Sequence, residues 1–95
     1  MQFLKTLRPR VRSGEITSSI RIWRSPRVSV GRRYAMEGGW IEIEAVREMS
    51  IEDISPGMAR DSGFEGLVDL LKTAKHGAGT RVFLIRFHYL SADEA

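Results

Sequence analysis

The sequence predicts a mainly β protein of the α+β class: a small β-barrel of about five or six strands with one main helix and one short helix. Residues 17–23 and 40–47 alternate between apolar and polar side chains, and residues 80–90 are an almost continuous run of β-forming residues. Residues 64–75 instead repeat apolar side chains at helical spacing. A chain of 95 residues with 42% hydrophobic content can bury one core, so residues 1–95 are expected to form a single domain.

The first residues are expected to form a strand and a turn. A short strand over Gln2–Leu7 should end before Pro9, because proline cannot donate a hydrogen bond to a neighbouring strand. Residues 10–13 should then make one helical turn or an irregular bend that ends at Gly14.

The strand predicted over Thr17–Trp23 divides its side chains between two faces. Ile20 and Ile22 should enter the core, because alternate residues of a strand point to opposite sides. The other face carries Ser19, Arg21 and Trp23. Trp23 is either an exposed platform for a nucleic-acid base or a residue that packs under the following loop, residues 24–30.

Residues 33–36 and 40–47 are expected to form two strands joined by a turn at Glu37-Gly38-Gly39. In the second strand, the inward residues should be Ile41, Ile43 and Ala45, and the outward ones Glu42 and Glu44. Two carboxylates on one strand face resemble a catalytic pair, but a solvated face is the ordinary explanation.

The C-terminal half is expected to hold the helices and the last strand. Ser50 with Asp53 resembles a capping box, which predicts a short helix over 51–60, interrupted near Pro56. The main helix over 64–75 should end at Gly77.

Residues 80–90 should form a central or barrel-closing strand. One face of it carries Phe83, Ile85, Phe87 and Tyr89, and the other Val82, Leu84, Arg86 and His88.

Positive charge is concentrated at the N-terminal end of the chain. Residues 1–33 carry nine basic side chains and one acidic one, a net charge of +8, whereas residues 34–95 carry six basic and eleven acidic ones, a net charge of −5. Twelve of the fifteen basic residues are arginines, which bind phosphates bidentately and stack on bases. This pattern favours RNA or another phosphate-bearing partner; the alternative is that the two halves pair their charges across one domain.

The composition also excludes several classes of protein. The chain has no cysteine, which rules out disulfides, thiolate catalysis and cysteine-ligated zinc. No apolar run approaches the length that spans a bilayer, and the first residues lack the apolar segment of a signal peptide. We therefore expect a cytoplasmic protein with no membrane partner, no metal and no cofactor.

The octamer Gly14–Arg21 reads G-E-I-T-S-S-I-R and resembles the signature G-x-K-x-x-E-x-R of ASCH domains. Gly14 and Arg21 match in place, whereas Ile16 stands at the lysine position and Ser19 at the glutamate position. The later segments G-F-E-G-L-V-D-L-L and V-F-L-I-R-F also resemble this family, so the likeness extends over nearly the full length. The resemblance implies a PUA-like barrel associated with RNA.

The resemblance also suggests a hydrolase, because some ASCH domains deacetylate N4-acetylcytidine and others are linked to ribonuclease activity. The deacetylases use the signature lysine, and Ile16 can neither polarise nor deprotonate a nucleophile. The remaining candidates are Ser19 or Thr17 as the hydroxyl, Arg21 as anion stabiliser, and Asp61 or Glu65 as the carboxylate, with Gly63 at the equivalent position. His76 and His88 are not paired in any motif. Loss of the lysine argues against an enzyme.

Three functions remain open. The first is an RNA-binding module with a basic cleft, whose candidate residues are Arg12, Arg21, Trp23, Arg24, Arg27, Arg32, Arg33 and Tyr34. The second is the nucleoside-acting or RNA-acting hydrolase. The third is a protein-interaction or regulatory domain whose basic and acidic surfaces bind other proteins.

Overall fold

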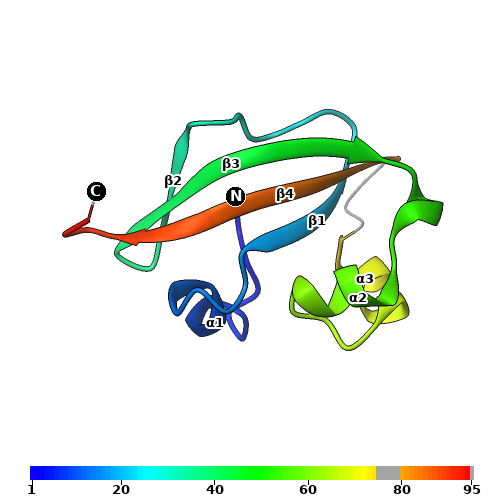
Figure 1. Ribbon diagram of the computed structural model, residues 1–95, viewed down its shortest axis with the longest axis horizontal. Coiled ribbons are helices and arrows are strands. Elements are labelled where there is room, and N and C mark those ends of the chain that lie inside the picture. The colour runs from blue at the N-terminus through cyan, green and yellow to red at the C-terminus, as the bar shows by residue number, and fades with distance from the viewer. Residues whose placement is uncertain (75–79, 95) are drawn as a thin grey trace.

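A computed structural model of the chain describes residues 1–74 and 80–94. It has a mixed α+β fold in which an antiparallel sheet of four strands curls into a half-barrel (Figure 1). The strands are β1 (Ser18–Trp23), β2 (Arg33–Met36), β3 (Gly39–Met49) and β4 (Arg81–Ser91), in the spatial order β1-β4-β3-β2. The α+β class is confirmed, but the described residues form four strands rather than five or six.

The strand predicted for Gln2–Leu7 is wrong, because this segment is irregular and residues 5–7 form a turn. The α1 helix (Arg8–Arg12) begins directly afterwards. Pro9 lies in the first turn of α1, where its missing N–H leaves no hydrogen bond unmade. Pro9 therefore helps to start a helix instead of ending a strand, and the predicted turn over 10–13 largely belongs to this helix.

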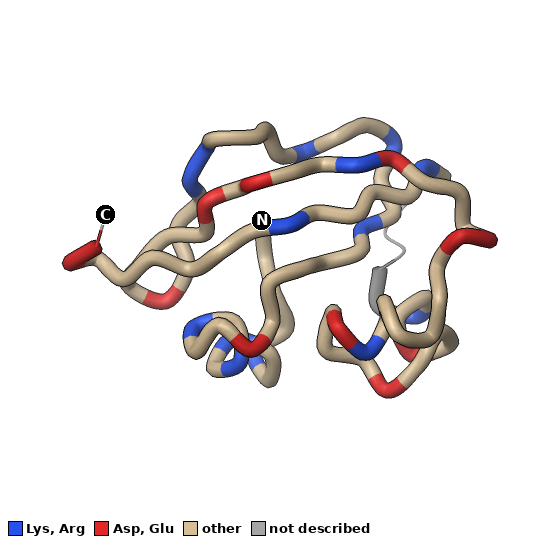
Figure 2. The backbone as a smooth tube through the Cα atoms, in the orientation of Figure 1, with Lys and Arg blue, Asp and Glu red and all other residues tan. Residues whose placement is uncertain are grey.

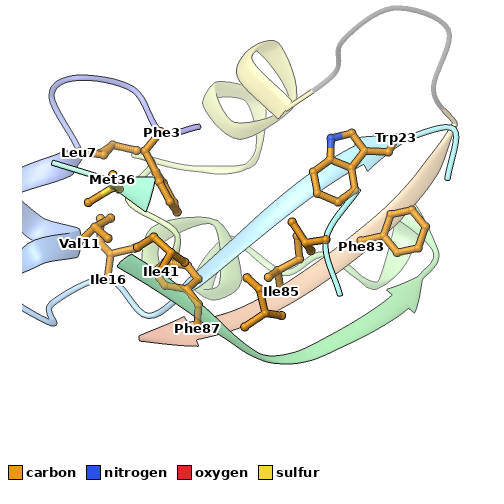
Figure 3. Close-up of a cluster of buried hydrophobic side chains, with 12 residues drawn as sticks. Phe3, Leu7, Val11, Ile16, Trp23, Met36, Ile41, Phe83, Ile85 and Phe87 are labelled. Carbon is orange, nitrogen blue, oxygen red and sulfur yellow. The ribbon is translucent and has the colours of Figure 1, made fainter. Parts of the chain in front are cut away.

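The last strand, β4, lies inside the sheet and contributes to two hydrophobic clusters. It pairs with β1 on one side and with β3 on the other. Phe83, Ile85 and Phe87 belong to the main cluster, whereas Val82 and Leu84 pack in the second, as the sequence pattern predicts. The main cluster also contains Phe3, Leu7, Val11, Ile16 and Trp23 (Figure 3).

The second cluster joins the other face of β1 to the C-terminal helices. Ile20 and Ile22 of β1 pack in it, as predicted, together with Ala59 and Leu70. The short helix predicted over 51–60 is divided into two pieces, η1 (Ile51–Asp53) and α2 (Pro56–Asp61). The capping box at Ser50 is present, and Pro56 starts α2.

The main helix, α3 (Leu67–Ala74), begins three residues later than the sequence pattern predicts. Phe64, expected in its first turn, lies in the connection before it. The helix end predicted at Gly77 lies outside the described residues. Among the residues that are described, no helix is long and apolar enough to cross a membrane.

The β2–β3 hairpin has a tight turn at Glu37–Gly38, as predicted, and both residues have positive φ angles of 50° and 77°. Within β3, the register with β4 shifts between Ile43 and Ala45, which makes Glu44 the extra residue of a β-bulge. The bulge reverses the alternation of side chains. Val46 therefore packs against the main cluster and Ala45 does not, so the predicted inward position of Ala45 is wrong.

Candidate functional site

A cavity of about 620 Å³ lies along β1, which is an edge strand of the sheet. Three parts of the chain form its walls: the N-terminal segment 1–4 with Leu7, β1 with the loop that follows it, and the connection between α2 and α3. Its polar and aromatic wall residues include Ser19, Arg21, Trp23, Arg27, Ser62 and Phe64. Segments distant in sequence therefore meet at this site.

Arg21 extends from β1 to the cavity wall and is partly buried. Its Nε donates a hydrogen bond to Ser19 Oγ at 2.8 Å, and its Nη2 donates to the carbonyl oxygen of Gln2 at 2.5 Å. The guanidinium carbon lies 5.1 Å from the centre of the Phe3 ring. Burial lowers the pKa of Arg21 to about 10, because the charged form loses hydration.

No carboxylate offsets the charge of Arg21 in the part of the chain that is described. The cavity wall contains neither Asp nor Glu, and none of the ion pairs includes this side chain. The amino group of Met1 lies at the same cavity, and its pKa is lowered first by burial and second by the charge of Arg21. A buried cation without an anion is unfavourable. The cavity is therefore suited to an anionic ligand.

Ser62 is a wall residue that the sequence analysis missed. It follows α2, is only 4% exposed, and its Oγ has no hydrogen-bond partner among the described residues. A buried hydroxyl without a partner typically costs about 1–3 kcal/mol, which a ligand atom in the cavity can recover. No motif marks this serine, because its role depends on the approach of the α2–α3 connection to β1.

Trp23 and Tyr34 are not exposed platforms for bases. Trp23 is buried against Phe83, with ring centres 5.9 Å apart, so the expectation of packing beneath the loop is the correct one (Figure 3). Part of Trp23 still lines the cavity. Tyr34 packs against the main cluster, and its hydroxyl accepts a hydrogen bond from the Ser29 N–H.

The structure brings Arg21, Trp23 and Arg27 together at one cavity and distributes the other candidate arginines elsewhere. Lysines and arginines are spread over α1, the β1–β2 loop and the strands (Figure 2). The candidates that do not line the cavity are Arg12, which lies over the Tyr89 ring, Arg24, Arg32, and Arg33, which pairs with Glu42 at 3.0 Å.

The hydrolase candidates are divided between two sites. Ser19 and Arg21 line the main cavity, whereas Thr17 and Asp61 line a second, smaller cavity of about 380 Å³. Glu65 lies at neither. No Asp, Glu or His of the described residues lines the main cavity, so none of these side chains can remove a proton from the Ser19 hydroxyl there.

The two positions that the resemblance would match to the ASCH lysine and carboxylate, Ile16 and Gly63, lie against each other. Ile16 is 2% exposed in the main cluster, near Val11, and does not line the cavity (Figure 3). Gly63 has a φ angle of +97°, and a Cβ at this position would lie 2.8 Å from Ile16 Cδ1. Neither position can take a charged side chain without displacing the core.

We expect Gly63→Ala to lower the free energy of unfolding by about 1–3 kcal/mol, because alanine is strained at positive φ and its methyl group would press on Ile16 and Leu7. Urea unfolding monitored by circular dichroism measures the effect. Gly66→Ala is the matched control, since a Cβ there meets no atom within 4 Å. Its free energy of unfolding should stay within about 0.5 kcal/mol of the original protein's. Equal urea midpoints of unfolding for Gly63→Ala and Gly66→Ala would contradict the expectation.

His88 has partners that the sequence motifs did not reveal. Its Nε2 lies 3.1 Å from Glu42 Oε2 and its Nδ1 lies 2.6 Å from Glu44 Oε1, on the exposed part of the sheet. Cross-strand pairing of Glu42 with His88 could have suggested this contact. No cluster suited to a metal ion occurs in residues 1–74 and 80–94, and His76 lies outside these ranges.

The chain was compared with family models, curated proteins and solved structures. The chain matches no family model, no curated protein and no solved structure. The likeness to ASCH domains therefore remains a sequence-based expectation. The function is inferred from the side chains that line the cavity.

Proposed function

We propose that the protein is an RNA-binding module of the ASCH type with a PUA-like half-barrel, and that one nucleotide of a single-stranded RNA enters the cavity along β1. The observation that carries this proposal is the partly buried Arg21, which has no carboxylate partner among the described residues. A phosphate would supply the missing negative charge, and arginine binds phosphates with paired N–H groups.

The other walls of the cavity fit the rest of a nucleotide. Half-buried Phe64, with the parts of Phe3 and Trp23 that line the cavity, gives it apolar and aromatic surface against which a base can pack. Arg27 is exposed and lies at the same cavity, where it can contact a second phosphate. The separation of the hydroxyl and carboxylate candidates supports binding over hydrolysis.

Salt dependence tests the proposal. Two arginines at the cavity should give a slope of about −1.4 for the logarithm of the association constant against the logarithm of salt concentration, since each phosphate contact to a single strand contributes about −0.7. A cleft of six arginines would give about −4. A slope near −4 would place the binding surface outside the cavity, and the absence of binding at low salt would contradict RNA binding altogether.

The intrinsic fluorescence of Trp23 provides a reporter for this titration. The chain has two tryptophans, and Trp40 lies on β3, is 39% exposed and does not line the cavity. A Trp40→Phe variant therefore leaves a single tryptophan at the site. Oligouridine of about ten nucleotides is a suitable unstructured probe, because it matches the usual length of a single-strand binding site.

A further inference from the structure

The guanidinium of Arg21 has donors available for a ligand. Its Nε and Nη2 bind Ser19 Oγ and the Gln2 carbonyl, whereas Nη1 has no hydrogen-bond partner in the described part of the chain. The Gln2 acceptor is a neutral backbone oxygen. A phosphate oxygen is a stronger acceptor because it is charged, so it can replace Gln2 and engage Nη1 and Nη2 together.

The size of the cavity limits what can accompany that phosphate. Its volume of about 620 Å³ falls within the range of about 300–1,000 Å³ in which proteins hold one small molecule. A phosphate inside an RNA chain joins two nucleosides, so an internal phosphate at Arg21 would bring parts of both into this space. A terminal phosphate would bring only one nucleoside into the cavity.

We propose that the cavity recognises the phosphorylated end of an RNA chain, with the terminal phosphate on Arg21 and the end nucleotide against Trp23 and Phe64. This inference rests on the proposed RNA-binding function and narrows it to a chain end. The buried Ser62 hydroxyl, which has no partner in the described residues, contributes a hydrogen bond to the same nucleotide. A terminal phosphate also carries more charge than an internal one, which strengthens its bond to an arginine.

The test compares oligouridines of one length that differ only at their ends: a 5′-phosphate, a 3′-phosphate, or hydroxyl groups at both. Binding is followed by Trp23 fluorescence in the Trp40→Phe protein. We expect one phosphorylated form to bind at least about tenfold more tightly than the form with two hydroxyl ends, since a hydrogen-bonded charge contributes this much. Equal affinities would overturn the inference and leave RNA binding intact. If no oligouridine binds, both proposals fail.

Two further experiments test whether the phosphate binds at Arg21 and whether the ligand is an RNA end or a free nucleotide. Arg21→Gln should abolish the preference for the phosphorylated end, whereas Arg32→Gln, at an exposed arginine outside the cavity, should retain it. A preference that survives in Arg21→Gln would overturn the assignment. Uridine monophosphate should compete at least about tenfold more weakly than the phosphorylated RNA, because it lacks the second phosphate that meets Arg27. Equal competition would identify a free nucleotide as the ligand and overturn recognition of an RNA end.

Discussion

Replacing Arg21 by methionine should weaken oligouridine binding by at least about 30-fold, because removing one member of a buried, hydrogen-bonded charge pair costs about 2–5 kcal/mol. The same change should not lower the melting temperature. Burial holds the pKa of Arg21 down at about 10, so the desolvation penalty of the charged form offsets the two hydrogen bonds that methionine would lose. This penalty is present at every pH below about 10 and disappears as the pH rises further, towards the ordinary pKa of an arginine.

Fluorescence titration and thermal unfolding of the same samples separate the two effects. Arg32→Met is the matched control, because Arg32 is exposed and lies outside the cavity wall. Its affinity should change by less than about threefold, as expected for a side chain that contributes only to long-range attraction. Equal losses in both variants would show that the cavity is not the binding site. A large fall in melting temperature for Arg21→Met would show that this arginine mainly stabilises the fold.

Introducing a lysine with Ile16→Lys, at the position that resembles the signature lysine of ASCH domains, should destabilise the protein by about 3–5 kcal/mol, since an ammonium group would enter the core without a carboxylate partner. Ile16 is 2% exposed, and a Cβ built on Gly63 would lie only 2.8 Å from Ile16 Cδ1, so there is little room for a longer side chain at position 16. The same variant should gain no activity on N4-acetylcytidine, because position 16 does not line the cavity.

Urea unfolding of Ile16→Lys is compared with that of Ile16→Val, which separates the effect of the buried charge from that of any change at position 16. Valine keeps the side chain apolar and should cost only about 0.5–1.5 kcal/mol. If the lysine variant is as stable as the valine variant, the side chain at position 16 reaches solvent, and the placement of this position in the core is wrong. Deacetylation by a folded Ile16→Lys protein would instead favour the hydrolase alternative.

The strands could be predicted where a single local pattern decided them. Alternation in residues 17–23 and 40–47 and the run of β-forming residues over 80–90 gave three strands. The period of two that a strand imposes on its side chains also gave the two faces of β4. Pro9 misled the prediction, since proline is compatible with both the end of a strand and the first turn of a helix. The bulge at Glu44 was not predictable from alternation, because it inserts one residue without changing the local composition.

The candidate site was predictable only in part, for a related reason. Arg21 could be found because it lies on the polar face of an alternating strand and at the arginine position of the signature. Ser62 and the segment 1–4 could not, because they become wall residues only when distant parts of the chain meet β1. For the same reason, the arginines close to Arg21 in sequence could not be sorted into those that reach the cavity and those that do not.

The position of β4 inside the sheet determines when the sheet can form during synthesis of the chain. β1 has its strand partner about sixty residues later, so its pairing in the sheet requires closure of a long loop. A ribosome releases the chain from its N-terminal end, and until Arg81–Ser91 has emerged neither β1 nor β3 can pair with β4. Until then β1 has no strand partner, although Ile20 and Ile22 can already meet Ala59 and Leu70 of the helices, so a nascent chain of this protein should complete its sheet late and cooperatively.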